Sequence, residues 1–180
     1  MAAKHYSVSS SRRARRSVII ITLGVVAIAG LAAPPSPKPG TLVWNYTPSV
    51  PIGLYRIDDR PWRKGDRVAV APSGEASIIL SNAKVLEPGR LLLKRVAASV
   101  GDVVCRNGAE VTINGRSAVV ARLNDGHGKS LPVWDGCLNL SANDVFLLGE
   151  TPASFDGRYF GVSAAADIVG RLTPLLISDN

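Results

Sequence analysis

The stretch Arg90-Leu91-Leu92-Leu93-Lys94-Arg95-Val96-Ala97 predicts an apolar β-strand with one lysine at its centre. Residues two apart in a strand share a face, so Leu92, Lys94 and Val96 line the same side. A lysine in this setting either extends its ammonium group to the edge of the sheet or is desolvated among its aliphatic neighbours. Desolvation lowers the pKa of the amine, which then becomes able to accept a proton near neutral pH.

Short strands separated by turns continue on both sides of this stretch and predict a mainly β domain. The pair Asn114-Gly115 between two of them is a strong hairpin signal. One helix is predicted at Ala76–Lys84, closed by Glu87-Pro88-Gly89. The remaining predicted strands are Thr41–Asn45, Gly53–Ile57, Arg67–Ala71, Val111–Ile113, Ser117–Val120, Val145–Leu148 and Ile168–Leu172.

The N-terminal part of the chain predicts export. Residues 1–16 hold five basic residues and no acidic one, and residues 17–33 form an uncharged run. This run fits either a short transmembrane anchor or the core of a removed signal peptide. The basic tail should stay in the cytoplasm, so both interpretations place the rest of the chain on the far side of the membrane. The proline-rich residues 34–40 predict a stiff linker to a domain at 41–180.

The net charge of +7 comes mostly from that tail. Without the five basic residues of the tail, 16 basic residues face 14 acidic ones. A nearly neutral domain is poorly suited to bind phosphate backbones, so direct binding of nucleic acid is not expected.

The two cysteines, Cys105 and Cys137, are interpreted as one disulfide, because an even pair in an exported domain is typical of one. A cysteine nucleophile would lack a credible histidine partner, and the wide spacing does not favour a metal site. No metal or cofactor is expected. The disulfide would close a glycine-rich stretch of about 105–140, which we interpret as an inserted flap or subdomain.

Ser49 is the candidate nucleophile. It lies between Pro48 and Pro51, whose rings restrict the backbone and predict a rigid turn. A simple proline-serine turn after the linker is the structural alternative. A serine hydroxyl needs a base to become nucleophilic, and Lys94 is the candidate base. A Ser-His-Asp triad would have to recruit His127 from a loop of the flap.

Asp156 and Arg158 flank a glycine in a third stretch, 154–161, which reads Ser-Phe-Asp-Gly-Arg-Tyr-Phe-Gly. Asp156 could pair with Arg158 and hold the loop that shapes a site, or it could orient the ammonium group of Lys94. The alternative is that Asp156 and Arg158 form an exposed ion pair in a loop, which would contribute little to stability.

In this order, the three stretches resemble motifs of the type I signal peptidases and of their conjugal-transfer branch, the TraF-type peptidases. The motifs are Thr-x-Ser-x-Pro-x-Gly at 47–53, Lys-Arg-(x)5-Gly-Asp at 94–102 and Ser-x-Asp-x-Arg-Tyr-Phe-Gly at 154–161. The similarity extends from about 41 to 176. Departures from the housekeeping leader peptidases favour the conjugal branch; they include Val50, Val100, Glu150 and Thr151.

The resemblance implies a signal peptidase-like antiparallel β domain and a role for each matching residue. Ser49 would be the nucleophile, Lys94 the general base and Asp156 an essential acidic residue supported by Arg158. The backbone N–H of Ser49 and the hydroxyl of Thr47 would form the oxyanion hole.

The resemblance also implies the function. The chain would be a serine endopeptidase of the inner membrane, with its catalytic domain in the periplasm. It would cut, or cut and cyclise, the pilin precursor of a conjugative type IV secretion system, and the flap could keep water from the acyl-enzyme. The alternatives are a general leader peptidase for exported proteins and a non-catalytic periplasmic β domain of the secretion apparatus.

Overall fold

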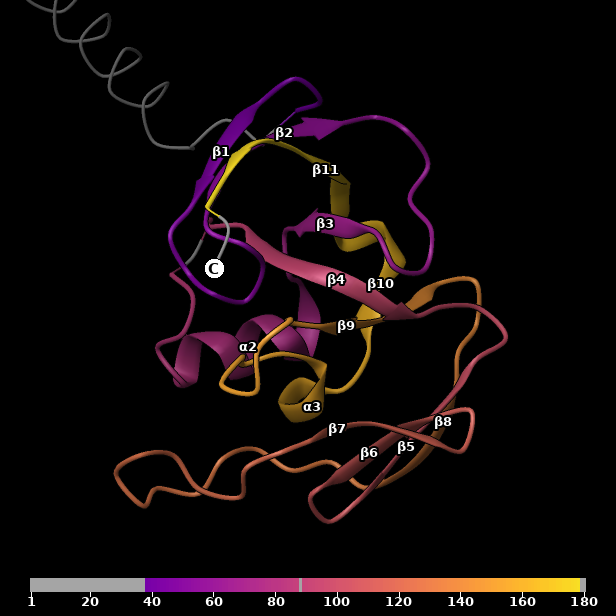
Figure 1. Ribbon diagram of the computed structural model, residues 1–180. Coiled ribbons are helices and arrows are strands. Elements are labelled where there is room, and N and C mark those ends of the chain that lie inside the picture. The colour runs from indigo at the N-terminus through magenta and orange to yellow at the C-terminus, as the bar shows by residue number, and fades with distance from the viewer. Residues whose placement is uncertain (1–37, 88, 179–180) are drawn as a thin grey trace, which may run out of the picture. The chain divides into compact units, whose positions relative to one another are not determined.

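The computed structural model describes residues 38–87 and 89–178, so the predicted membrane segment at 17–33 lies outside the described residues. Within those two ranges, no helix is both long enough and apolar enough to span a bilayer. Two antiparallel sheets form most of this part of the chain (Figure 1). The predicted mainly β, antiparallel class is therefore confirmed.

The larger sheet has seven strands in the order β1-β2-β11-β3-β4-β9-β10, and each neighbouring pair is antiparallel. Strand β4, which carries Lys94, lies between β3 and β9 (Figure 1). The strands are β1 (Leu42–Asn45), β2 (Gly53–Asp58), β3 (Arg67–Val70), β4 (Leu92–Ala98), β9 (Asp144–Leu148), β10 (Ser163–Ala164) and β11 (Ile168–Ile177).

Strand β4 is buried on both faces, and its side chains alternate as the sequence predicts. Leu92 and Val96 pack with Leu80 of helix α2 (Gly74–Asn82) in one core cluster, on the face that also bears Lys94. Leu93 packs on the opposite face with Tyr55. Apolar side chains cover both faces of β4 and exclude water from it, so the backbone and the aliphatic stem of Lys94 lie inside the core.

Strand β11 and helix α2 differ from their predicted bounds for local reasons. Strand β11 continues to Ile177, past the predicted end at Leu172, because a register shift after Pro174 accommodates the missing N–H of the proline. Helix α2 begins and ends two residues before the predicted Ala76–Lys84. It ends early because Lys84 has a φ of 55°, which a right-handed helix cannot contain.

The smaller sheet has the order β7-β6-β5-β8 and comes from the stretch in which an inserted subdomain is predicted. Its strands are β5 (Val103–Asn107), β6 (Glu110–Ile113), β7 (Arg116–Val120) and β8 (Gly136–Asn139). Asn114 and Gly115 both have positive φ and form the predicted hairpin turn between β6 and β7. The predicted disulfide is confirmed: Cys105 and Cys137 are bonded and lie opposite each other on β5 and β8.

Strands β5 and β8 were not predicted, because neither has a local signal. They pair across a long insertion, and the disulfide joins residues 32 positions apart. Two short elements of the larger unit were also not predicted, the single-turn helix α3 (Gly157–Phe160) and strand β10. The two sheets share one apolar cluster, in which Val104 and Val111 of the smaller sheet pack with Phe146 and Leu148 of β9.

Candidate active site

The turn that carries Ser49 is held by a side chain that the sequence analysis did not single out. Asn45, the last residue of β1, is 5% exposed. Its Nδ2 donates to the carbonyl oxygens of Thr47, Val50 and Pro51 at 2.8, 2.9 and 3.0 Å. Its Oδ1 accepts from the N–H of Thr47 at 3.2 Å. A buried amide with all of these partners fixes the turn more firmly than the two prolines do alone.

The hydroxyl of Ser49 is oriented by the hydroxyl of Thr47, and their oxygens lie 3.0 Å apart. Thr47 Oγ1 donates its one hydrogen to Asn45 Oδ1 at 3.1 Å, so Ser49 is the donor to Thr47. The backbone of Ser49 is anchored from the other side, since the N–H of Glu150 donates to its carbonyl at 2.8 Å. Ser49 is thus joined to strand β1 and to the turn after β9.

Lys94 is desolvated, which decides between the two interpretations of the sequence. Only 3% of the residue is exposed. Burial lowers its pKa to about 8, the negative charge of Asp156 partly offsets this, and the positive charge of Arg158 adds to it. Its Nζ donates to Ser154 Oγ at 2.9 Å. The amine therefore has one defined partner and spends a substantial fraction of its time neutral near pH 7.

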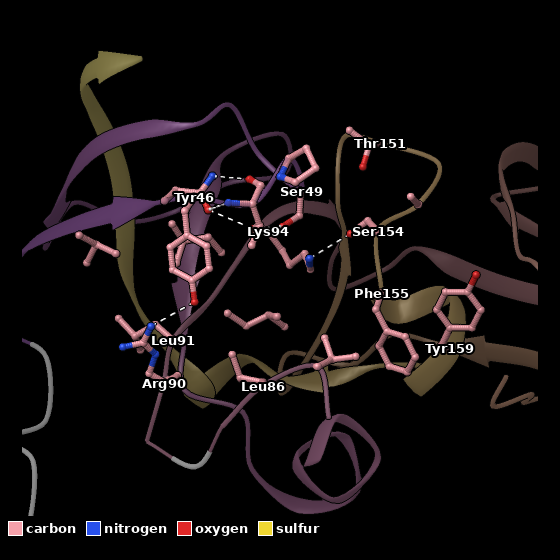
Figure 2. Close-up of a pocket in the computed structure, with 18 of the residues that line it drawn as sticks. Tyr46, Ser49, Leu86, Arg90, Leu91, Lys94, Thr151, Ser154, Phe155 and Tyr159 are labelled. Atoms are coloured by element: carbon pink, nitrogen blue, oxygen red, sulfur yellow. Dashed lines mark hydrogen bonds between the residues drawn. The ribbon is translucent and has the colours of Figure 1, made fainter. Parts of the chain in front are cut away.

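Ser49, Lys94 and Ser154 converge at the same end of one cavity (Figure 2). Gly149 lies between the two serines: a Cβ on Gly149 would be 2.0 Å from Ser154 Oγ and 3.2 Å from the Cβ of Ser49. Only a glycine leaves room for both side chains. Among the described residues, the hydrogen bond of Lys94 goes to Ser154 and that of Ser49 goes to Thr47, and none joins Ser49 to Lys94 directly.

Asp156 is fully buried and acts as the N-cap of α3. Its carboxylate accepts from the N–H of Gly149 at 2.8 Å and forms a bidentate pair with Arg158, at 2.8 and 2.9 Å. Arg158 also donates to the carbonyls of Pro152 and Thr151. Two roles were considered for Asp156, pairing with Arg158 to hold the loop and orienting Lys94. Its hydrogen bonds agree with the pairing role. Its charge reaches Lys94 through space and raises the pKa of that amine.

The cavity has a volume of about 710 Å³ and mainly apolar walls. Its walls come from the end of β1, the start of β4, the loop after β9 and the loop between β7 and β8. Figure 2 shows Tyr46 and Arg90 joined by a hydrogen bond at one side, opposite Phe155 and Tyr159. A cavity with such walls can accept small or apolar side chains.

Residues 11–176 match the family model described as signal peptidase, peptidase S26. The chain belongs to this signal peptidase family. The motif resemblance at residues 47–53, 94–102 and 154–161 is thereby confirmed at the level of the family.

Relatives of this signal peptidase family member include conjugal transfer proteins. The probable conjugal transfer protein TraF of Sinorhizobium fredii is 32% identical, covering 93% of this chain and 94% of its own. The conjugal transfer protein TraF of Agrobacterium tumefaciens is 33% identical, covering 91% and 97%. A plasmid transfer protein TraF of Escherichia coli is 32% identical, covering 73% and 81%.

A solved signal peptidase I from Enterococcus faecalis is also similar, with a TM-score of 0.38 and 22% identity over 63% of this chain and 98% of its own. The family assignment rests on the sequence matches.

Of the residues given a role by the sequence analysis, Thr47, Ser49 and Lys94 line the cavity, while Asp156 and Arg158 lie behind it. The sequence analysis missed three contributors. Ser154 is part of the motif at 154–161, but the sequence analysis gave it no role. Its hydroxyl, two residues before Asp156, was the available signal for a partner of Lys94. Gly149 gave no signal, because its value depends on the contact with Ser49 across the fold. Asn45 makes its contacts within its own turn, and an asparagine just before a proline-bounded turn is a local signal that could have found it. His127 does not line the cavity, and its N–H donates to Asp125.

No site for a metal is formed by the described ranges 38–87 and 89–178, in which no three His, Cys, Asp or Glu side chains are grouped as ligands would be. Both cysteines are committed to the disulfide.

Proposed function

We propose that the chain is a membrane-associated serine endopeptidase of the signal peptidase type, with Ser49 as nucleophile and Lys94 as general base. The observation that carries this proposal is the burial of Lys94, whose pKa falls to about 8 at the end of the cavity that also holds Ser49. About a tenth of such an amine is neutral at pH 7, whereas an ordinary lysine is neutral in roughly one molecule in three thousand. The difference supplies the base that a serine needs.

The proposed reaction begins with a rotation of Ser49 about its Cα–Cβ bond, which moves the hydroxyl from Thr47 to Lys94. Lys94 Nζ takes the proton as Ser49 Oγ attacks the scissile carbonyl carbon. The Lys94 ammonium group then gives this proton to the departing amine, and the acyl group stays on Ser49 as an ester. Water, or the amine of a polypeptide, then attacks the same carbon and gives a proton to neutral Lys94. The bond from the acyl carbon to Ser49 Oγ breaks, and Lys94 returns the proton to Ser49 Oγ.

Two groups would stabilise the oxyanion that forms between these steps, the N–H of Ser49 and the hydroxyl of Thr47. The Thr47 hydroxyl already lies 3.0 Å from Ser49 Oγ. Once Ser49 turns away, Thr47 can rotate its hydrogen from Asn45 to the developing negative charge. A donor that points at the developing charge is worth about 3 kcal/mol in the transition state.

The proposed substrate is the pilin precursor of a conjugative type IV secretion system. The support is the similarity to proteins named for conjugal and plasmid transfer. The apolar cavity fits the small and apolar residues around an export cleavage site. Attack of water on the ester gives a linear product, and attack of the pilin's own terminal amine gives a circular one.

The proposed location is the inner membrane, with the catalytic domain in the periplasm. The support lies in the apolar run 17–33 and in the disulfide, which is typical of an oxidising compartment. At the cavity, β1 and the residue after it expose Leu42, Trp44 and Tyr46, by 57, 57 and 65%. Exposed aromatic and aliphatic side chains of this kind are at home near a lipid interface.

The test is processing of the pilin precursor by the full chain in membranes. Ser49→Ala and Lys94→Ala should each abolish cleavage, while Ser81→Ala, an exposed serine at the end of α2, should leave it unchanged. Mass spectrometry of the product distinguishes the two outcomes of the ester, since a circle is one water lighter than the linear chain. Normal cleavage by Ser49→Ala or Lys94→Ala would contradict the proposed dyad and favour a non-catalytic role in the transfer apparatus.

A second arm separates the pilin-specific role from a general one. The protein is supplied to cells depleted of their own leader peptidase. We expect no rescue of growth from a pilin-specific enzyme, and rescue would favour a general leader peptidase with many exported substrates.

A further inference from the structure

Three contacts join the disulfide-closed subdomain to helix α3. Arg106 Nη1 of β5 donates to the carbonyl of Arg158. Trp134 Nε1 donates to the carbonyl of Gly157 at 2.9 Å, and the N–H of Arg122 donates to the hydroxyl of Tyr159 at 3.1 Å. A helix of four residues leaves most of its carbonyls without a partner inside the helix. Arg106 supplies a donor to the carbonyl of Arg158, whereas the carbonyl of Gly157 accepts from Gly161 N–H as well as from Trp134.

Arg106 is the most constrained of these three residues. It is 1% exposed and shares the inward face of β5 with Val104. It also donates to the carbonyls of Gly108 and Pro132, at 2.9 and 3.3 Å. Among the described residues it has no ion pair, and its Nη2 has no hydrogen-bond partner.

A guanidinium group stays charged when it is buried, so this arrangement is unfavourable for stability alone. An aliphatic side chain would fill the same space without the cost of desolvating a cation. The buried charge is favourable at one place: its guanidinium donates a charge-assisted hydrogen bond to the carbonyl of Arg158 in α3. This points to the position of α3 as the property that Arg106 serves.

Helix α3 in turn holds the residues at the cavity. Its N-cap, Asp156, accepts from Gly149, and Arg158 fixes Thr151 and Pro152. Between these anchored points lies Ser154, whose hydroxyl is the hydrogen-bond partner of Lys94. A shift of α3 would therefore move Ser154 relative to Lys94, although Arg106 itself is not among the residues that line the cavity.

We infer that Arg106 is a positioning residue: from the disulfide-closed subdomain, it fixes α3 and thereby sets the geometry of Ser154 and Lys94. The catalytic part of this inference rests on the proposed peptidase function, and the geometric part does not. The subdomain is then a support for the catalytic loop as well as a wall of the cavity.

The experiment compares Arg106→Met, Arg106→Lys and the control Arg116→Met in the full chain. Arg116 lies exposed on β7 of the same sheet. The first readout is kcat and KM for precursor cleavage, and the second is amide hydrogen exchange of residues 149–158. Arg106→Met should lower kcat by roughly ten- to a hundredfold with little change in KM, because small displacements of catalytic groups have effects of this size. It should also speed exchange in the loop.

Arg106→Lys keeps a cationic donor within reach of the Arg158 carbonyl, so it should recover part of the lost kcat. Arg116→Met should behave as the unaltered chain in both readouts. Should Arg106→Met fail to fold, Trp134→Phe replaces it, since this change removes the donor to Gly157 and keeps an aromatic ring in place. Trp134→Phe should again lower kcat and speed exchange.

The inference is wrong if the Arg106 variants lose thermal stability while kcat and the exchange of residues 149–158 stay as in the unaltered chain. A chain that is inactive before any substitution overturns the peptidase proposal instead. In that case the exchange of residues 149–158 alone decides whether Arg106 positions the loop.

Discussion

At the scale of single residues, the site depends on one amine that folding removes from water. Lys94 is surrounded by aliphatic side chains of the sheet and α2, and its hydrogen bond goes to Ser154. The neighbouring charges have opposite effects on its pKa, since Asp156 raises it and Arg158 lowers it. Because these two side chains neutralise each other, burial remains the dominant effect, and the amine titrates near pH 8.

The rate of cleavage should follow this titration. In the proposed mechanism the active form of Lys94 is the neutral amine, so kcat/KM should rise with pH and level off above a midpoint near 8. The measurement is a pH profile of precursor cleavage from pH 6 to 10, with the fold monitored by circular dichroism at each pH. A profile that is flat across pH 8, or that falls there, contradicts Lys94 as the base.

The same burial should cost stability. The unfolded chain holds the Lys94 proton up to its ordinary pKa of 10.5, while the folded chain releases it at about 8. Between these values the unfolded state binds more protons, so stability rises with pH across this window, and the full penalty, about 3 kcal/mol, applies below pH 8.

Lys94→Met should therefore be inactive and more stable than the unaltered chain. We expect a gain of about 2 kcal/mol near pH 6.5, because the lost hydrogen bond to Ser154 offsets about 1 kcal/mol of the relieved penalty. The gain should shrink between pH 8 and 10.5. Urea unfolding at pH 6.5 and at pH 10.5 measures both values, and a loss of stability at pH 6.5 would show that the amine is not desolvated.

At the scale of elements, the turn after β9 brings together parts that are far apart in the chain. Glu150 anchors Ser49 through its N–H and pairs with Arg67 of β3 through its carboxylate. Gly149 leaves room for the side chains on both sides of the turn. The turn thus connects Ser49, next to β1, with the loop that leads to α3.

Gly149→Ala should disturb both serines at once. The added Cβ would overlap Ser154 Oγ and press on the Cβ of Ser49, and no alternative position is open to it in the buried turn. We expect a loss of about 1–3 kcal/mol of unfolding free energy and a fall in kcat.

Gly126→Ala is the matched control for stability, since a Cβ there meets nothing within 4 Å. Because Gly126 lines the cavity, the control for the cleavage rate is Ser81→Ala, which lies outside it. Thermal melts and cleavage rates test the expectation, and a Gly149→Ala variant that matches its controls in both would show that the turn adapts to the added methyl group.

At the scale of the whole domain, the disulfide stabilises the subdomain on which α3 depends. Cys105 and Cys137 close a loop with a sequence separation of 32, for which chain entropy predicts a contribution of about 3–4 kcal/mol. The paired substitution Cys105→Ser with Cys137→Ser should reduce the unfolding free energy by this amount.

The same double variant should also lower kcat if α3 follows the subdomain. Chemical unfolding and precursor cleavage, each with and without reductant, measure the two effects. Reductant should weaken the unaltered chain and leave the double variant unaffected. An unchanged rate in the double variant would mean that the subdomain keeps its contacts with α3 without the covalent link.

Much of this protein was predictable from its sequence because the signals are local. Strand periodicity identified β4 and the face of Lys94, proline and glycine identified the turn of Ser49 and the hairpin at Asn114, and the even cysteine pair identified the disulfide. Each signal acts over a few neighbouring residues, so the order of residues is enough to reveal it.

Tertiary structure alone decided the rest. Whether Lys94 is desolvated depends on which residues pack around it, and that is a property of the sheet and α2 together. Gly149, Ser154 and Arg106 have their roles through contacts with residues 52 to 100 positions away. Charge and burial act through distance in space, and a chain acquires those distances only when its distant segments meet.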